Sequence, residues 1–489
     1  MGIRGTARSL FRGAEEFDLT SGSIGKPLFF LSLPIVVTNL FQTAYNLADT
    51  FWLGQYSTDA LAAISFAFPM VFLLISFGMG ISVAGSVLVA QFTGAGEPRK
   101  AEYAASQTVT FAAIVSVVLG VVGYFGVDTF LGLIGASDTV LPLAVSYLEV
   151  ISLGLLFMFG FFVFVALMRG YGDTITPMLV MFGSVALNIV IDPFLIFGWT
   201  VVENAPLVGT VAFPELGIQG AAIATVFSRG LGLIVGLAIM FRGNRGVQIH
   251  LRDMAPDFSY LPRLVRIGLP ASLEGGGRAL SMNLLLVIVA FFPDTVVAAY
   301  GIGTRVFSVI FLPAIAVARG VETMTGQNMG ADKPDRAASA AKLAASVLFG
   351  VLTAAGILVW FTAAPIADLF TTDPAVVGIT EQFLRYVALT FGFIGITRAY
   401  TGSFRGAGKT LTAAVISVAT LGVIRFPIAW VASGPLAEAG IWVAFAISNV
   451  AGAVIAFLWY RRGSWREKDL TNSQPPQEKP RIETPADGD

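Results

Sequence analysis

The chain has 489 residues, of which 55% are hydrophobic and 12% are charged, and its formal net charge is -1. Soluble domains carry about 25% charged residues, so this composition excludes an ordinary soluble protein and indicates a polytopic membrane protein. The absence of cysteine excludes disulfides and thiol catalysis, and the single histidine, His250 in a polar loop, excludes a histidine proton relay inside the membrane. The balanced charge gives no indication of a nucleic-acid partner.

Twelve apolar runs have the length of membrane-spanning helices rather than of barrel strands. They lie at 27–51, 60–90, 103–125, 141–168, 174–197, 217–241, 264–291, 297–325, 337–361, 379–404, 411–431 and 439–460. We therefore expect an all-α integral membrane protein with twelve transmembrane helices in two six-helix bundles. The expected domains are a cytoplasmic segment at 1–26, a first bundle at 27–241, a cytoplasmic linker at 242–263, a second bundle at 264–462 and a disordered cytoplasmic tail at 463–489. Since the first apolar run is a full span, no cleavable signal peptide is expected.

The first span contains a polar stripe within an otherwise apolar helix. Its members are Asn39, Gln42, Asn46 and Asp49. Steps of three and four residues put them on one face, which must turn toward protein or a water-filled cavity because lipid cannot satisfy it. Pro34, near the start of the helix, removes a backbone N–H and predicts a kink. Asp49 is either a functional residue, as ionisable intramembrane groups usually are, or a hydrated structural residue near the helix end.

The loops between the spans separate by charge. One alternate set contains Arg99, Lys100, Arg169, Arg242, Arg245, Arg252, Arg263, Lys333, Arg336, Arg405, Lys409, Arg461 and Arg462. The other set contains no lysine or arginine but has Asp59, Asp128, Asp138, Glu203, Glu215, Asp294, Asp368, Asp373 and Glu438. By the positive-inside rule, we expect a multi-pass protein with both termini in the cytoplasm.

The two halves of the chain are related by a shift of 236 positions. This shift places Leu33 on Leu269, Pro34 on Pro270, Gln91 on Gln327, Gly94 on Gly330, Arg169 on Arg405 and Gly170 on Gly406. Six helices per half give both copies the same orientation, so the repeat axis lies along the membrane normal, and a substrate cavity is expected between the halves. The alternative is a duplication without mechanistic meaning.

The buried acids break this symmetry. Asp49 maps onto Leu285, and Asp192 maps onto an apolar position, so the first bundle alone holds this acid pair. In the fifth helix, Ser184, Asn188 and Asp192 step by four and share one face.

Four polar side chains of the first bundle lie at one depth. They are Asp49, Asp192, Tyr147 and Thr225. Each is a few residues from the outer end of its helix, roughly 5–12 Å below the interface at about 1.5 Å per residue. With Asn188 they form a candidate cation site, because two close carboxylates cannot both ionise cheaply and can take up a proton, or sodium with oxygen ligands. The expected sodium ligands are Asp49, Asn188, Asp192 and Thr225. The alternative is a hydrogen-bonded polar core that holds the bundle together.

The second bundle is richer in arginine. Its spans or their ends contain Arg278, Arg305, Arg319, Arg385, Arg398 and Arg425. Helical spacing predicts local ion pairs for three of them, namely Glu274/Arg278, Arg319/Glu322 and Glu381/Arg385. The other three either line a cavity and bind an anionic group or snorkel outward. Glu274, at the repeat position of Thr38, is the best acid in this half for a second cation or for substrate.

Several motifs, in one order along the chain, are similar to those of a transporter family. They are LPIVVTNLFQTAYNLADTFWLG, GAGEPRKAE, SYLEV, LMRGYGDTITPM, LNIVIDPFLIFG and LGIQGAAIAT. On these motifs the chain resembles the multidrug and toxic compound extrusion (MATE) family, in its prokaryotic DinF-like branch, over nearly its whole length except the tails. The resemblance implies a V of two six-helix bundles in a prokaryotic cell membrane. It also implies efflux of organic, often cationic and aromatic compounds, driven by inward sodium or proton flow.

The resemblance also implies roles for single residues. The coupling-ion site of the family falls on Asp49, Tyr147, Asn188, Asp192 and Thr225. The candidate residues for the substrate cavity or the gate are Pro34, Asn39, Gln42, Asn46, Ser184 and Glu274. By the same resemblance, the first helix bends at Pro34 when the site changes occupancy. A related branch uses an acid in helix seven, which Glu274 matches, but the partner acid in helix ten is not evident.

We therefore expect a secondary active antiporter, not an enzyme, that exports small organic compounds by alternating access between the two bundles. Na+ or H+ is the expected coupling ion, and no other cofactor is expected. The expected partners are the substrate and membrane lipid, and the protein is expected to be a monomer. The alternative function is a lipid-linked saccharide flippase of the same superfamily, which would use the second-bundle arginines on a phosphate. No nucleophile–base set, Walker loop or histidine metal-ligand pair supports an enzyme.

Overall fold

The computed structural model describes residues 18–134, 139–205 and 209–467, which are almost entirely helical. The first lobe contains α2 (Gly25–Tyr56), α3 (Thr58–Gly94), α4 (Pro98–Ile134), α5 (Leu141–Leu153), α6 (Leu155–Tyr171), α7 (Ile175–Phe197) and α8 (Ile218–Arg242). The second lobe contains α9 (Leu261–Val289), α10 (Asp294–Gly330), α11 (Pro334–Phe361), α12 (Ala363–Asp368), α13 (Pro374–Ala388), α14 (Phe391–Gly406), α15 (Thr410–Val418), the π-helical segment η3 (Ala419–Arg425), α16 (Phe426–Leu436) and α17 (Glu438–Arg461). Short 3-10 turns lie at η2 (Leu251–Asp253) and η4 (Ser464–Arg466).

The expected twelve spans in two lobes are confirmed, although some spans are broken helices. Within the described residues, nine helical segments are long and apolar enough to cross a membrane, and α5 with α6, bent by 55°, makes a tenth. The other two spans are α9 and the pair α13 and α14, whose charged side chains, such as Glu274 and Arg278 in α9, lower their hydropathy. α2 continues as one helix through Pro34, which interrupts the backbone ladder at one hydrogen bond only.

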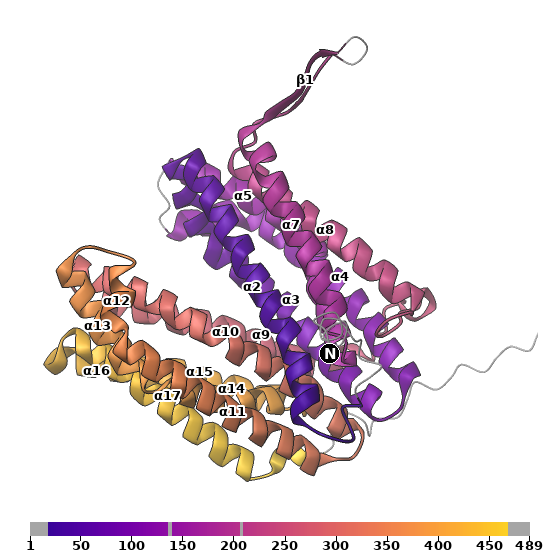
Figure 1. Ribbon diagram of the computed structural model, residues 1–489. Coiled ribbons are helices and arrows are strands. Elements are labelled where there is room, and N and C mark those ends of the chain that lie inside the picture. Colours follow the sequence, from indigo (N-terminus) through magenta and orange to yellow (C-terminus); the bar gives the residue numbers. More distant parts are fainter. Residues whose placement is uncertain (1–17, 135–138, 206–208, 468–489) are drawn as a thin grey trace, which may run out of the picture.

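The loop between α7 and α8 contains a feature that the sequence did not predict. It forms an antiparallel hairpin of β1 (Trp199–Ala205) and β2 (Gly209–Phe213). Trp199 pairs with Phe213, and Ala205 pairs with Gly209. The hairpin projects beyond the helices at one end of the first lobe (Figure 1).

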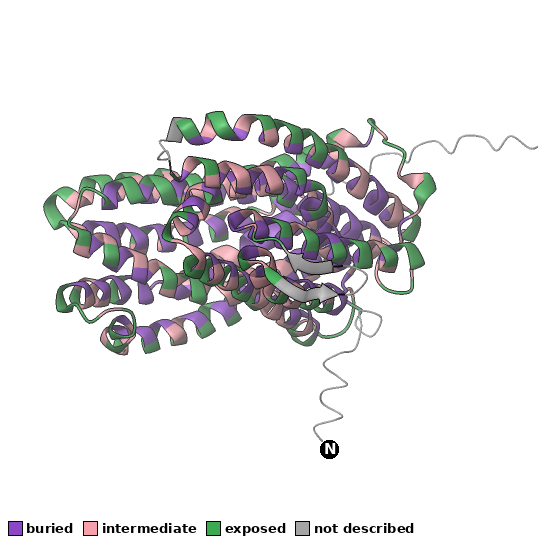
Figure 2. Ribbon diagram, turned by 90° about the horizontal axis from the view of Figure 1, so that it is seen from above, coloured by how far each residue is buried: buried purple, intermediate pink, exposed green. Residues whose placement is uncertain are grey.

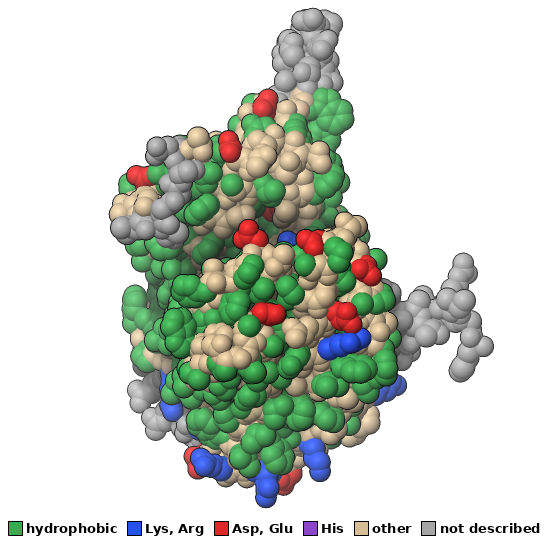
Figure 3. Space-filling view, turned by 90° about the vertical axis from the view of Figure 1, so that its left-hand side faces the viewer, with side chains coloured by type: hydrophobic (Ala, Val, Ile, Leu, Met, Phe, Trp, Pro, Cys, Tyr) green, Lys and Arg blue, Asp and Glu red, His purple; other side chains and the backbone are tan. Residues whose placement is uncertain are grey.

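The two lobes form a V (Figure 1). At one end α2 and α3 of the first lobe pack against α9 and α10 of the second, and at the other end the lobes part. Seen from above, buried residues lie mainly inside the lobes and exposed residues mainly on their outer faces (Figure 2). Figure 3 looks onto the parted ends, where acidic side chains lie between large hydrophobic areas.

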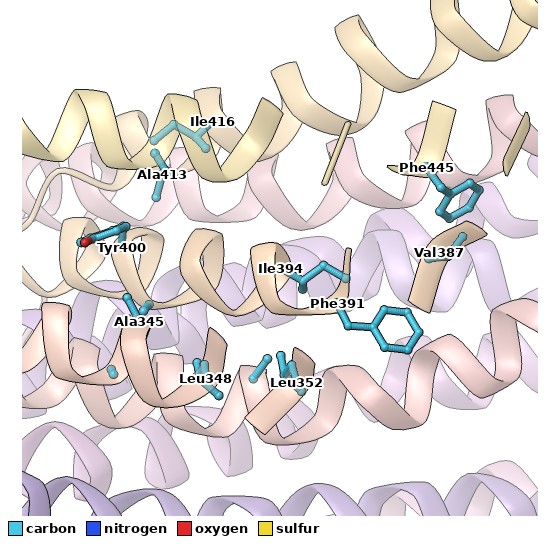
Figure 4. Close-up of a cluster of buried hydrophobic side chains, with 14 of the residues drawn as sticks. Ala345, Leu348, Leu352, Val387, Phe391, Ile394, Tyr400, Ala413, Ile416 and Phe445 are labelled. Carbon is cyan, nitrogen blue, oxygen red and sulfur yellow. The ribbon is translucent and has the colours of Figure 1, made fainter. Parts of the chain in front are cut away.

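The second lobe has a continuous apolar core. Figure 4 shows part of it, where side chains from α11, α13, α14, α15 and α17 meet. The labelled residues are Ala345, Leu348, Leu352, Val387, Phe391, Ile394, Tyr400, Ala413, Ile416 and Phe445. This close packing makes the second lobe one compact unit.

Two equivalent hydrogen bonds, one from each half of the repeat, connect the joined ends of the lobes. Gln91 Nε2 donates to the backbone oxygen of Gly406 (3.0 Å), and Gln327 Nε2 donates to that of Gly170 (3.2 Å). The shift of 236 residues maps the first bond onto the second, so the internal repeat is also a repeat of contacts. The hydrogen bonds cross between α3 and α14 and between α10 and α6, and they therefore tie one lobe to the other.

Glycines allow α3 and α10 to approach at this joined end. A Cβ atom added at Gly94 would lie 1.9 Å from the backbone oxygen of Gln327, and one added at Gly330 would lie 1.8 Å from that of Gln91. Backbone atoms cannot rotate away from such a contact. We therefore predict that Gly94→Ala forces the joined ends apart.

The test uses spin labels on cysteines introduced at the exposed positions Arg99 and Asp335, at the starts of α4 and α11. Gly94→Ala should lengthen the distance between the labels. Gly350→Ala, whose Cβ would meet nothing within 4 Å, is the matched control and should leave the distance unchanged. An unchanged distance in Gly94→Ala would show that this contact does not hold the lobes together.

Candidate functional site

Two carboxylates of the first lobe lie side by side inside the protein. Asp49 of α2 is 5% exposed and Asp192 of α7 is 0% exposed. Their carboxyl groups are close enough to interact with each other electrostatically. Asn188, one turn before Asp192, donates from Nδ2 to Asp192 Oδ1 (3.0 Å). Because two ionised carboxylates are acceptors only, a contact between them is stable only with a shared proton or cation.

The pair leaves several buried oxygens without a partner. Asp49 Oδ1, Asp192 Oδ2 and Asn188 Oδ1 have no hydrogen-bond partner among the described residues. Two carboxylates with neutral oxygens nearby form a donor set that suits a proton or a hard cation such as sodium. Within the described parts of the chain, no cluster of three or more His, Cys, Asp or Glu side chains forms a metal site.

Three further side chains close around the acids. The hydroxyls of Tyr45 and Thr225 are 2.5 Å apart and join α2 to α8, and Tyr45 is close enough to Asp49 to interact with it electrostatically. Tyr147 of α5 is buried and interacts electrostatically with both Asp49 and Asp192. The five residues predicted for the coupling-ion site are thus brought together, with Tyr45 added. Tyr45 lies four residues before Asp49 on the same helical face, which is the signal that could have identified it.

Arg229 of α8 is a second residue that the sequence reasoning missed. It is buried, and its Nη2 donates to Gln42 Oε1 (2.7 Å). Its guanidinium lies 5.1 Å from the ring centroid of Tyr45 and 4.9 Å from that of Phe161. The two aromatic faces and the amide compensate for part of the cost of burying this charge. Arg229 shares a helical face with Thr225, four residues earlier, so its position beside the acids was readable from α8.

A cavity of about 720 Å³ adjoins the acid pair. Its polar wall is the predicted stripe of α2, where Asn39, Gln42, Asn46 and Asp49 line it. Its apolar lining includes Leu61, Ile64, Phe68, Val71, Phe72, Ile75, Met79, Ile151, Met158 and Phe162. α10 of the second lobe contributes Ile315 and Arg319, so the cavity reaches the space between the lobes.

Three predicted cavity or gate residues lie elsewhere. Ser184 is buried against α8 and donates to the backbone oxygen of Ser228 (3.0 Å). Pro34 lies near the start of α2, and its carbonyl accepts from Thr38 Oγ1 (2.8 Å). Glu274 is in the second lobe, where it is occupied by ion pairs.

The charged cluster around Glu274 includes Arg405, which the sequence predicted to lie in a loop. Instead, Arg405 lies buried inside α14 and bonds both Glu274 and Glu322 at 3.0 Å. Two carboxylates offset the cost of burying its charge. The predicted local pairs are confirmed, at 3.5 Å for Glu274 and Arg278 and at 2.9 Å for Arg319 and Glu322.

The remaining second-lobe arginines are in different surroundings. Glu381 pairs with Arg385 at 2.7 Å, as predicted. Arg425 of η3 is buried and donates to Ser448 Oγ (2.8 Å) and Asn449 Oδ1 (2.9 Å), whereas Arg305 is exposed. Arg425 is therefore satisfied inside the lobe and is not available to a ligand.

Comparisons with known proteins match this chain to one family and to relatives named as transporters or multidrug resistance proteins. The sequence matches the MatE family over residues 34–194 and 270–431, one stretch in each lobe. It is 27% identical over 457 residues to the "Probable multidrug resistance protein YpnP" of Bacillus subtilis, covering 93% of this chain and 99% of that one. It is 28% identical over 448 residues to the "FAD transporter" of Shewanella oneidensis, covering 92% and 97%.

Solved structures share the fold. A structure described as the outward-facing conformation of a multidrug resistance MATE family transporter of the MOP superfamily aligns with a TM-score of 0.82 and 25% identity, covering 91% of this chain and 97% of that one. A MOP superfamily transporter from Pyrococcus furiosus aligns with a TM-score of 0.82 and 24% identity, covering 92% and 98%. The second likeness concerns the fold alone.

The close carboxylates predict an unusual effect on stability. Asp192→Asn removes one of two like charges while keeping the shape and the hydrogen-bonding capacity of the side chain. We expect the purified protein to become more stable at alkaline pH by on the order of 1 kcal/mol, which is the free energy of about one pKa unit. Thermal unfolding in detergent measures the change. Asp128→Asn, at an exposed position of α4, should have no such effect. Destabilisation by Asp192→Asn would contradict the claim that the two carboxylates repel each other.

Proposed function

The chain belongs to the MatE family, and on that premise we propose that it is a secondary active exporter of small organic compounds. In this proposal, inward movement of Na+ or H+ through the site at Asp49 and Asp192 drives the export. The observation that supports it most directly is the buried acid pair at the wall of the cavity. An acid pair in a membrane lobe is costly unless an ion neutralises it, and the same cost makes it responsive to ion gradients.

The ion site and the cavity share one helix. α2 provides Asp49 to the acid pair and Asn39, Gln42 and Asn46 to the cavity wall. A cation that binds at Asp49 removes the repulsion between the carboxylates, and α2 can then repack against α7. Substrate and ion therefore compete through the shape of α2, which is what exchange requires.

Alternating access follows from the two ends of the V. The lobes are parted at the end near the acid pair and tied at the other end by the Gln91 and Gln327 contacts. Breaking this tie while the parted ends close would move the opening to the other side of the membrane. The positive-inside rule assigns the tied end, with Arg99 and Lys333, to the cytoplasm of a bacterial cell.

Transport in vesicles tests the coupling. With protein reconstituted in one orientation, efflux of a fluorescent organic substrate should follow an imposed inward gradient of either sodium or protons. Asp192→Asn should abolish the response because the side chain can no longer exchange charge, and Asp128→Asn should retain it. Efflux that is independent of both gradients in the wild-type protein would contradict the proposal.

Pro34 makes a separate prediction about rate. Pro34→Ala restores a backbone N–H to the first turns of α2 and stiffens that helix. Equilibrium binding of the ion should be nearly unchanged, whereas turnover should fall several-fold because α2 repacks more slowly. Pro69→Ala, at a proline inside α3, is the matched control. If Pro34→Ala and Pro69→Ala have the same turnover as the wild type, α2 does not switch at this proline.

A further inference from the structure

The charged lining of the cavity is mostly positive. Within the described residues it consists of Arg169, Arg229, Arg319 and Asp49. Arg229 is occupied by Gln42 and by two aromatic rings. Arg319 bonds Glu322 through Nη1 (2.9 Å), and Arg169 has no such pair in the described part of the chain. Arg169 and Arg319 both line the cavity, one from each lobe, and are close enough to interact electrostatically. A cavity that selects organic cations alone would gain nothing from this excess of guanidinium groups.

The internal repeat shows that Arg169 lacks the partners of its counterpart. The shift of 236 residues maps Arg169 onto Arg405, which is bonded to Glu274 and Glu322. In the first lobe the positions of these two glutamates are occupied by Thr38 and Ser86. Consequently Arg169 forms no salt bridge among the described residues, and its buried Nε has no hydrogen-bond partner there.

The second lobe does not supply the missing negative charge. Five arginines and two glutamates interact in one cluster, namely Arg169, Arg278, Arg319, Arg398, Arg405, Glu274 and Glu322. Arg398 forms no salt bridge within the described part of the chain and lies over the ring of Phe311, with its guanidinium 5.1 Å from the ring centroid. The cluster therefore has an excess of three positive charges next to the cavity, and such charges are costly in a membrane protein without a counter-ion.

We propose that Arg169 and Arg319 bind the acidic group of an amphiphilic organic anion, and that such anions are a substrate class of this transporter. The guanidinium fork matches sulfonate, phosphate and carboxylate oxygens. The apolar body of the ligand would lie on the Phe68, Phe72 and Phe162 side of the cavity. This inference rests on the proposed export function and names its substrate. A coupling cation and an anionic substrate attract each other, so they would not displace one another by electrostatic repulsion. Exchange of the two would then depend on the change in shape of α2.

Equilibrium binding tests the site without any gradient. The probes are naphthalene-2-sulfonate and 2-naphthyltrimethylammonium, which share an aromatic body and differ in charge, and calorimetry on the purified full chain measures both. The sulfonate should bind more tightly than the ammonium compound. Arg169→Gln should weaken sulfonate binding roughly tenfold or more, as expected for the loss of a charge-assisted hydrogen bond, and should leave the ammonium compound unaffected.

Two variants keep this result interpretable. Arg169→Lys retains the charge and should recover part of the affinity. Arg305→Gln removes an exposed arginine of α10 outside the cavity lining and should change neither affinity. Arg169 has no carboxylate partner among the described residues, so Arg169→Gln leaves no acid unpaired, and an unchanged unfolding temperature verifies the fold.

Several outcomes would overturn the inference. Equal affinity for the two probes, or equal effects of Arg169→Gln and Arg305→Gln on the sulfonate, would mean that water alone solvates these arginines. Binding of a short-chain fluorescent phosphatidate through Arg169, without binding of the naphthalenesulfonate, would contradict a site for exported organic anions and assign it to a membrane-lipid phosphate. These measurements need no ion gradient, so they are independent of the vesicle assay. Loss of coupling in vesicles would reject the antiport proposal without affecting the anion site.

Discussion

The free-energy cost of two carboxylates inside a membrane protein is the constraint on which the rest of the first lobe depends. Asp49 and Asp192 are each expensive to bury, and their contact adds repulsion unless a cation or a proton lies between them. The surrounding polar groups of Tyr45, Asn188 and Thr225 reduce this cost but do not remove it. In the proposed mechanism this cost makes the site take up an ion, and α2 transmits its occupancy to the cavity wall.

The two halves of the protein share a backbone and differ in charge. The Gln91 and Gln327 bonds show that the repeat preserves the contacts that join the lobes. The acids follow another pattern, because Asp49 corresponds to Leu285, and Glu274 corresponds to Thr38. The first lobe consequently has a close acid pair with Arg229 as its neighbouring cation, and the second has arginines in excess over its glutamates. In the proposed mechanism, the symmetric contacts form the axis about which both lobes rock, while the asymmetric charges give ion and substrate different places to bind.

The sequence predicted the features that depend on local periodicity. Spans of apolar residues, the repeat, and the common depth of Asp49, Tyr147, Asp192 and Thr225 can all be read from spacing, since membrane helices run nearly parallel. Contacts between helices could not be read in this way. Arg229 finds aromatic rings from two other helices, and Arg405 finds glutamates on α9 and α10, so their burial depends on packing that spacing alone does not specify. The 55° bend between α5 and α6 and the β1–β2 hairpin likewise had no periodic signal.

The central claim is that Asp49 and Asp192 act as one ion site, and a double-mutant cycle on gradient-driven efflux tests it most directly. The variants are Asp49→Asn, Asp192→Asn and the two combined, each verified for insertion and thermal stability. If one ion is shared between the carboxylates, either single substitution should cost about as much coupled transport as both together, because residues that act as a unit are not additive. Additive losses, with partial ion-coupled efflux left in each single variant, would contradict a shared site.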